Sequence, residues 1–309
     1  VYLFQIIVLE GSNRFGGWLK TIKAGDGSKM ELGPRSIRPV GPSGFNTLCL
    51  IEDLNIENDL IHVAKSEPAA RNRFIYANDQ LNKLPNKMIS LLTRQPPFSK
   101  PLAMYGMHDL MTKQGSLQDE SVYDFFSRRF DEDLAKYAMD PLCRGIFAGD
   151  CRHISVISCF PPMHDAEKVG GSLIKGMFKR SRNKVVPHRK SSLSDRAKEE
   201  HWSTYSFKQG LQQLSDSLAE SLGFEPNIEL VKDAACSSVS FKDGKANVLV
   251  NGEIVEADHV VSSIYAADLA KILEPGLQSL STGLDTIPAV DTVVVCMEFD
   301  GSVQPPTPG

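Results

Sequence analysis

The chain opens with a short, mostly apolar run and then becomes polar. Residues 5–9 predict a fully buried strand that ends at Glu10, because the run offers apolar side chains to both faces of a sheet. Further along, residues 74–76 and 81–84 flank the pair Asn78-Asp79, which predicts a β-hairpin. The first part of the chain therefore contains strands joined by polar loops.

The middle of the chain has a helical pattern. Apolar residues at helical spacing predict helices at residues 43–54, 88–92, 101–112, 121–130 and 134–146. Residues 175–190 then hold seven Lys and Arg residues and no acidic residue. A one-sided charge run of this kind predicts a solvated, mobile loop.

The last third predicts a meander of short strands. After a leucine-rich helix, the β-type runs lie at residues 228–231, 237–242, 246–250 and 253–257. Asp243-Gly244 and Asn251-Gly252 separate these strands and suit type I′ turns. Residues 259–263 and 289–299 predict two more strands, with a helix at 266–273 between them.

Composition is that of an ordinary globular protein. Of its 309 residues, 41% are hydrophobic and 23% are charged, and the formal net charge is −4. This balance argues against a nucleic-acid partner, because nucleic-acid binders usually carry a basic excess. There is no run of about 18 apolar residues, so no transmembrane helix is predicted, although attachment to one face of a membrane stays open.

The six cysteines are scattered along the chain. They form no CxxC pair and no zinc-type spacing with histidine, so neither a disulfide framework nor a metal site is predicted. We interpret them as small core or surface residues.

The strongest candidate site follows the first predicted strand. Its sequence is Glu10-Gly-Ser-Asn-Arg14-Phe-Gly16-Gly17-Trp18. In doubly wound dinucleotide-binding folds, an acidic residue at the end of a strand accepts hydrogen bonds from ribose hydroxyls. Adjacent glycines let the backbone approach a flat cofactor closely, an arginine can pair with a pyrophosphate, and a tryptophan can cover a ring face. The ordered set predicts a flavin site.

This passage resembles the second half of the FAD fingerprint of the flavin amine-oxidase superfamily. Other segments are similar to the oxygen-dependent protoporphyrinogen oxidases of the animal mitochondrial type, a family within that superfamily. These segments are residues 31–39, 72–74, 96–101, 143–149, 158–161 and 256–263. The resemblance covers nearly the whole chain to about residue 300.

The resemblance implies an FAD site built from several segments. Its residues would be Glu10, Gly11, Arg14, Gly16, Gly17, Trp18, Gly33, Pro34, Arg35, Ser36 and Ala235. Relatives usually carry glycine at the position of Ser36, so that contact would use the backbone. They often carry valine at the position of Ala235, whose backbone would face the adenine. Arg35 has two open interpretations, one as a group that reaches the flavin edge or an anion and one as a surface arginine.

For the substrate, the resemblance points to Arg73 and Gly145. The matching arginine of the family is thought to bind a propionate carboxylate, which a guanidinium can hold bidentately. Gly145 matches a glycine in the wall of the substrate cavity, where a larger side chain would crowd the macrocycle. From the residues alone, the better interpretations would be a solvated Arg73 beside a hairpin and an ordinary glycine at a helix end.

The histidines are dispersed and suggest no acid–base pair, so we assign no catalytic residue. A flavin oxidase fits this pattern, because its cofactor carries the chemistry. The resemblance implies FAD-dependent oxidation of protoporphyrinogen IX to protoporphyrin IX in haem synthesis, with O2 as acceptor and hydrogen peroxide as product. It also implies a homodimer attached monotopically to the mitochondrial inner membrane, on the intermembrane-space side.

We therefore expect an α/β protein with an incomplete, doubly wound FAD-binding domain. That domain would comprise residues 1–67 and 201–265, interrupted by a mainly helical insert at 68–200 and followed by the start of an α+β substrate domain at 266–309. The apolar residues of the insert suit a membrane-facing or substrate-channel surface, or the core of the insert itself. They include Leu91, Leu92, Phe98, Leu102, Met104, Met107 and Met111.

The glycine-rich first half of the FAD fingerprint would lie upstream of Val1. We therefore expect a piece truncated at both ends that is inactive by itself. Two alternatives stay open: a non-catalytic fragment that at most binds partners or porphyrin, and an amine-oxidase-like flavoenzyme of the same superfamily.

Overall fold

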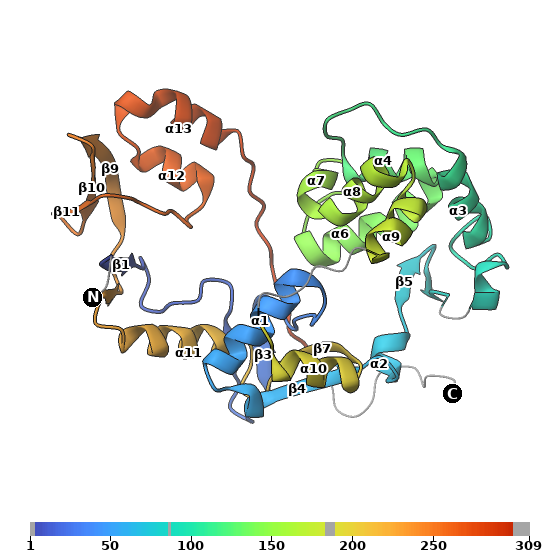
Figure 1. Cartoon of the computed structure of the whole chain (residues 1–309), viewed down its shortest axis with the longest axis horizontal. Coiled ribbons are helices and arrows are strands. Elements are labelled where there is room, and N and C mark those ends of the chain that lie inside the picture. The colour runs from blue at the N-terminus through green and yellow to red at the C-terminus, as the bar shows by residue number, and fades with distance from the viewer. Residues whose placement is uncertain (1–3, 86–87, 183–188, 299–309) are drawn as a thin grey trace. The chain divides into compact units, whose positions relative to one another are not determined.

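The computed structural model describes residues 4–85, 88–182 and 189–298. Within these ranges the chain divides into two compact units (Figure 1). The first contains residues 4–62, 191–199 and 204–298 and mixes strands with helices. The second contains residues 63–182, 189–190 and 200–203 and is mainly helical. The predicted α/β class is confirmed, and the predicted domain boundaries stay a prediction.

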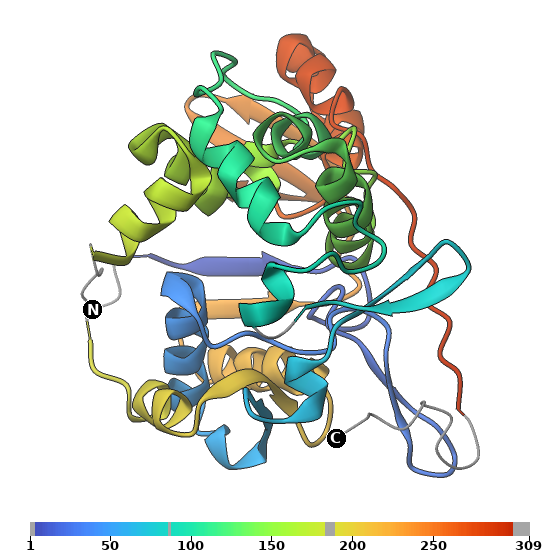
Figure 2. The same ribbon diagram turned by 90° about the vertical axis from the view of Figure 1, so that its right-hand side faces the viewer.

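A parallel strand pair lies at the start of the first unit. β1 (Ile6–Leu9) pairs with β8 (Ile228–Val231), and Ile6 lies opposite Ile228. Figure 2 shows the two strands side by side, in blue and orange. Parallel neighbours need a long crossover connection, and helix α11 (Gln212–Gly223) packs against β8 just before it. This is the local pattern of the doubly wound class.

The predicted full burial of β1 is wrong. Ile6 is 45% exposed and Ile7 is 39% exposed. Among the described residues the sheet holds two strands, so β1 is an edge strand. The prediction assumed a central strand of a larger parallel sheet, which is covered on both faces. The strand itself and its end at Leu9 agree with the prediction.

The predicted meander is confirmed for three of its four strands, because residues 228–231 form β8 in the parallel pair. It consists of β9 (Cys236–Lys242), β10 (Lys245–Val250) and β11 (Glu253–Ala257), paired in antiparallel order. The first residues of its two turns have φ of 53° and 51°, and the glycines that follow have φ of 77° and 90°. Positive φ at both central positions is the type I′ geometry that the sequence predicts. The small core against this sheet contains Ala234, Val239, Val248 and Val250.

Four further pairs of elements lie wholly or partly in the first unit. β2 (Thr21–Lys23) pairs with β3 (Lys29–Glu31), and β4 (Leu60–Ala64) pairs with β7 (Trp202–Phe207). Helix α1 (Gly41–Asp53) contacts α10 (Ser192–Glu199), and α12 (Ala266–Ile272) contacts α13 (Gln278–Asp285). Two short 3₁₀ turns are η1 (Glu57–Asp59) and η4 (Pro275–Leu277). In α1, Leu48 and Ile51 of the predicted apolar stripe are fully buried.

Two predicted strands are wrong. Residues 259–263 and 289–298 have no strand structure, and residue 299 lies outside the described ranges. Val261 is 96% exposed and Val293 is 85% exposed. A β-branched run forms a strand only with a partner to pair with, and neither segment has one among the described residues.

The second unit contains one hairpin and many short helices. β5 (Phe74–Ala77) and β6 (Gln80–Lys83) form the predicted hairpin, with positive φ at Asn78 and Asp79. The helices are α2 (Pro68–Arg71), η2 (Met88–Leu91), α3 (Leu102–Met111), α4 (Val122–Arg129), α5 (Glu132–Leu134), the π-helical η3 (Ala135–Met139), α6 (Asp140–Phe147), α7 (Val156–Cys159), α8 (Pro161–Gly170) and α9 (Leu173–Arg182). The predicted helices are thus confirmed, with η2 in the 3₁₀ form.

The predicted basic loop is wrong for residues 175–182. α9 runs through Arg182, so half of that segment is helical, and residues 183–188 lie outside the described ranges. Two contacts explain the helix. The Asp109 carboxylate accepts hydrogen bonds from the amides of Leu173 and Ile174, at 3.2 and 3.0 Å, and so caps the first turn. At Gly176 a Cβ would lie 1.7 Å from the Ala166 carbonyl oxygen, so only glycine allows α9 to press against α8.

A buried ionic cluster holds the helical unit together. The Arg129 side chain is fully buried, and its Nε donates to Asp109 at 2.6 Å. Its two other nitrogens donate to the Glu167 carboxylate at 3.1 Å and to backbone carbonyls. Arg128 adds a second guanidinium that bridges Glu167 and Glu120. Burial raises the pKa of Glu167, but hydrogen bonds from Arg128 and from the Gly115 amide outweigh burial and leave the pKa below its ordinary value.

We expect Arg129→Met to destabilise the helical unit by about 3–5 kcal/mol, because it leaves Asp109 and Glu167 charged, buried and short of a partner. Urea unfolding followed by circular dichroism measures the loss. Arg144→Met is the matched control, since it removes a guanidinium from an exposed pair with Asp140 and should cost less than about 1 kcal/mol. Equal losses in the two variants would contradict the role given to burial.

Candidate functional site

Glu10 stands at the carboxyl end of β1. Its amide donates to the Val231 carbonyl and its carbonyl accepts from the Ala234 amide, both at 2.9 Å, so pairing with the β8 segment continues past the strand. The Glu10 carboxylate accepts a hydrogen bond from the Ser12 amide at 2.7 Å. Hydrogen bonds from the hydroxyl and the amide of Ser12 lower the pKa of Glu10, so the group is an ionised acceptor at neutral pH.

Gly11 lies directly against Ala235. A Cβ added at Gly11 would be 3.7 Å from the Ala235 Cα, which is ordinary contact distance. The fold thus joins two of the predicted cofactor residues that are far apart in sequence. Both residues are exposed, as a backbone that faces a ligand must be.

The two glycines of the turn are required by its geometry. Gly16 has φ of 108°, and a Cβ there would lie 2.4 Å from the Ser215 hydroxyl on α11. Gly17 has φ of 49° and open space around it. Side chains rarely adopt such φ values, so both positions favour glycine. The turn therefore rests on α11 and leaves its Gly17 backbone accessible.

The second predicted loop meets this turn at Gly33. A Cβ at Gly33 would lie 2.0 Å from the carbonyl oxygen of Trp18, so the two backbones touch. The residues that follow, Pro34, Arg35 and Ser36, are exposed. The fold thus brings the two predicted segments, Glu10 to Trp18 and Gly33 to Ser36, to one place in the first unit.

Arg14 braces the turn from within. Its guanidinium donates to the carbonyls of Phe15 at 3.0 Å and Leu19 at 3.2 Å, and also to the Gly17 carbonyl. These bonds fix the backbone that carries Gly16 and Gly17. The predicted pairing of Arg14 with a pyrophosphate stays a prediction.

Sequence reasoning missed two residues at this site. Glu31 accepts hydrogen bonds from the Leu211 amide at 2.8 Å and the Thr21 hydroxyl at 2.9 Å, and so ties the β2–β3 hairpin to the start of α11. Tyr265 precedes α12, and its hydroxyl accepts a hydrogen bond from the Trp18 indole at 2.9 Å. Glu31 lies in a segment that resembles the family, but no local pattern marks Tyr265.

The residues present at this turn fit a flavin dinucleotide. Glu10 offers an ionised acceptor for ribose hydroxyls, and the glycine backbones allow a cofactor to approach closely. The Trp18 side chain is 72% exposed, which leaves its ring face free to cover a cofactor ring. Large aromatic side chains seldom stay this exposed without a partner.

The two predicted substrate residues lie in the helical unit. Arg73 precedes β5 and is exposed, with its guanidinium 3.5 Å from the Ala69 carbonyl, the outer limit of a hydrogen bond. Gly145 lies on α6, and a Cβ there would meet no described atom within 4 Å. β5 contacts η3, which continues into α6. Their assignment to the substrate stays a prediction.

The apolar residues of the insert divide between its core and its surface. Phe98 is 2% exposed and belongs to the core, whereas Met104, Met107 and Met111 of α3 are 51%, 59% and 75% exposed. An apolar hollow of about 460 Å³ lies between η2 and α3, lined by Ile89, Leu91, Leu92, Leu102 and Ala103. None of the described helices is long and apolar enough to cross a bilayer.

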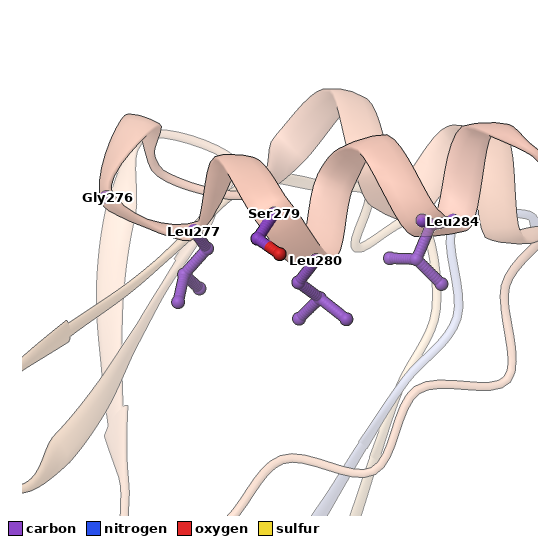
Figure 3. A pocket seen from close by; sticks show the side chains of 6 residues that line it. Gly276, Leu277, Ser279, Leu280 and Leu284 are labelled. Carbon is purple, nitrogen blue, oxygen red and sulfur yellow. The ribbon is translucent and has the colours of Figure 1, made fainter.

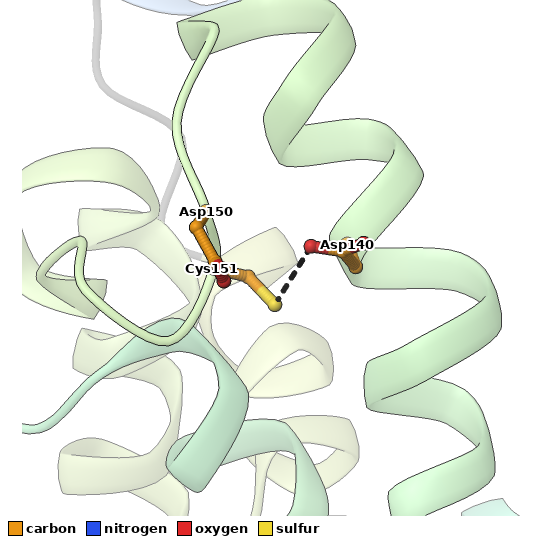
Figure 4. Close-up of side chains that lie close together, drawn as sticks. All are labelled: Asp140, Asp150 and Cys151. Atoms are coloured by element: carbon orange, nitrogen blue, oxygen red, sulfur yellow. Dashed lines mark hydrogen bonds between the residues drawn. The ribbon is translucent and has the colours of Figure 1, made fainter. Parts of the chain in front are cut away.

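Two further features do not belong to the flavin turn. Along α13, Leu277, Leu280 and Leu284 line an open apolar hollow of about 550 Å³ without ionisable groups (Figure 3). In the helical unit, Asp140, Asp150 and Cys151 lie close together, and the Cys151 thiol donates to Asp140 at 3.4 Å (Figure 4). Burial and this hydrogen bond raise the pKa of Cys151 to about 12, so the thiol is protonated at neutral pH and donates to Asp140.

Comparison with known proteins connects this geometry to a family. The family of flavin containing amine oxidoreductases matches residues 4–308. Protoporphyrinogen oxidase of Bos taurus is 37% identical over 301 residues, and that of Homo sapiens is 36% identical. Each alignment covers 97% of this chain and 63% of the relative, so the chain spans less than two thirds of the relatives' length. The resemblance to protoporphyrinogen oxidases seen in the sequence is confirmed.

Solved structures share the fold. A protein of Exiguobacterium sp. superposes with a TM-score of 0.59 at 21% identity, over 87% of this chain and 55% of that one. Cyclohexylamine oxidase of Brevibacterium oxydans superposes with a TM-score of 0.56 at 14% identity, over 90% and 56%. These identities establish the fold alone, and the family match covers almost the whole chain. The chain belongs to the flavin containing amine oxidoreductase family.

Proposed function

We propose that the protein oxidises protoporphyrinogen IX to protoporphyrin IX in haem synthesis, with FAD as cofactor, O2 as acceptor and hydrogen peroxide as product. The observation that carries the proposal is the contact of Gly33 with Trp18 at the turn that follows β1. This contact brings the two predicted flavin-binding segments together, in a chain that is 37% identical to a protoporphyrinogen oxidase.

In this proposal the residues of the turn bind and orient the cofactor. Glu10 accepts hydrogen bonds from the adenosine ribose, and the backbone beside Gly17 and Gly33 admits the cofactor closely. Arg14 keeps that backbone in place through its three carbonyl contacts. When bound, the flavin would supply the hydride acceptor, and we assign no general base among the protein's residues.

Arg73 binds the substrate in this proposal. Among the described residues the Arg73 guanidinium makes one hydrogen bond, a long one to the Ala69 carbonyl, so it can turn towards a ligand at little cost. A propionate carboxylate matches the planar fork of a guanidinium in shape and charge.

We also propose a homodimer that attaches monotopically to the mitochondrial inner membrane, on the side of the intermembrane space. The exposed methionines of α3 support such attachment, because an interfacial helix needs one apolar face rather than a full span.

Gly33→Ala should lower the flavin content of the full-length gene product. The new Cβ would overlap the Trp18 carbonyl and force the two loops apart, at a cost of about 1–3 kcal/mol. Absorbance near 450 nm per mole of protein measures bound flavin, and roughly a tenfold loss in affinity is expected. The control is Gly25→Ala, because a Cβ there meets no described atom within 4 Å. Unchanged flavin affinity in Gly33→Ala would refute this arrangement of the site.

Arg73→Ala should reduce kcat/KM for protoporphyrinogen roughly ten- to a hundredfold, the effect of losing one charge-assisted pair of about 1.5–3 kcal/mol. Flavin content should not change. Porphyrin fluorescence follows turnover in the full-length gene product. Arg71→Ala is the matched control, since Arg71 is an exposed arginine two residues away. If both variants keep full activity, Arg73 does not bind the propionate.

A further inference from the structure

Trp18 and Tyr265 form an exposed aromatic pair in the first unit. The indole Nε1 donates to the Tyr265 hydroxyl at 2.9 Å, and the two ring centroids are 6.4 Å apart with their planes at 42°. Trp18 is 72% exposed and Tyr265 is 54% exposed. A hydrogen bond between two such exposed side chains gains little in water, so its importance lies in the orientation that it imposes.

The backbone of Trp18 is already fixed. Its carbonyl lies against Gly33, and the turn before it is braced by Arg14. The remaining freedom of this residue is therefore the rotation of its indole. The Tyr265 hydroxyl restricts that rotation from a segment 247 residues away in sequence.

The two ends of the turn have different neighbours. Glu10 and Gly11 lie against Ala234 and Ala235, next to the ionised carboxylate that suits a ribose. Trp18, at the other end, contacts the Tyr265 ring, and the neighbouring Ile264 is 51% exposed. The first end is polar and suits a nucleoside, whereas the second end suits a flat, largely apolar ring.

We propose that Tyr265 is a positioning residue of the flavin site, which holds the Trp18 indole as one wall for the isoalloxazine ring. This inference rests on the proposed function. An exposed side chain that binds a ring must give up its rotamer freedom, and a hydrogen bond formed before binding removes part of that cost. The pair should therefore strengthen binding of the ring half of FAD and leave the nucleotide half unaffected.

The test uses Tyr265→Phe in the full-length gene product, freed of cofactor. This change removes the hydroxyl and keeps the ring. Affinities are measured for three probes: FAD, riboflavin, which carries only the ring half, and ADP, which carries only the nucleotide half. We expect Tyr265→Phe to raise the Kd for FAD and riboflavin roughly two- to tenfold, the effect of one neutral hydrogen bond, with no change for ADP. Tyr76→Phe, at an exposed tyrosine of β5, should change none of the three.

The outcomes separate the two proposals. If the wild-type protein binds FAD, and Tyr265→Phe binds FAD and riboflavin as tightly as the wild-type protein does, the role of Tyr265 is refuted and the flavin site stands. An equal loss for ADP would also refute it, because that result indicates a general change in the fold rather than a contact with the ring. If the wild-type protein binds no flavin, the proposed function itself fails.

Discussion

The fully buried guanidinium of Arg129 fixes the helical unit. A charge without water is stable only when all its donors are used, and here they reach Asp109 on α3, Glu167 on α8 and the carbonyl of Gly171 just before α9. Since a guanidinium is planar and rigid, these acceptors cannot move independently. Asp109 then extends the constraint to α9 by capping its first turn. The helical unit can be compact because this one side chain orders three helices.

In the first unit, order comes instead from close backbone contact. Gly16 rests on Ser215 of α11, and Gly33 rests on Trp18, so two loops and a helix meet where no side chain would fit. Glu31 secures the same region by joining the β2–β3 hairpin to the first turn of α11. The site can therefore leave its backbone open to a cofactor and still keep its shape.

The features that the sequence predicted correctly depend on local chemistry. Asn-Gly and Asp-Gly favour type I′ turns wherever they occur between strands, and both turns of the meander have that geometry. The wrong predictions depend on distant partners. Residues 175–182 have the charge pattern of a loop but form a helix, because Asp109 caps its first turn and Gly176 packs against Ala166. Residues 289–298 have the pattern of a strand but lack a neighbouring strand among the described residues. Tyr265 could not be found because its partner lies 247 residues away.

The burial of Cys143 and Cys151 affects how they react with peroxide, the product in the proposed function. Peroxide oxidises thiolates far faster than thiols. Burial raises the pKa of Cys143 to about 11, and burial together with Asp140 raises that of Cys151 to about 12. At neutral pH fewer than about one in a thousand of these side chains would carry the reactive charge. The same close packing that orders the helical core thus keeps Cys143 and Cys151 in their less reactive, protonated form.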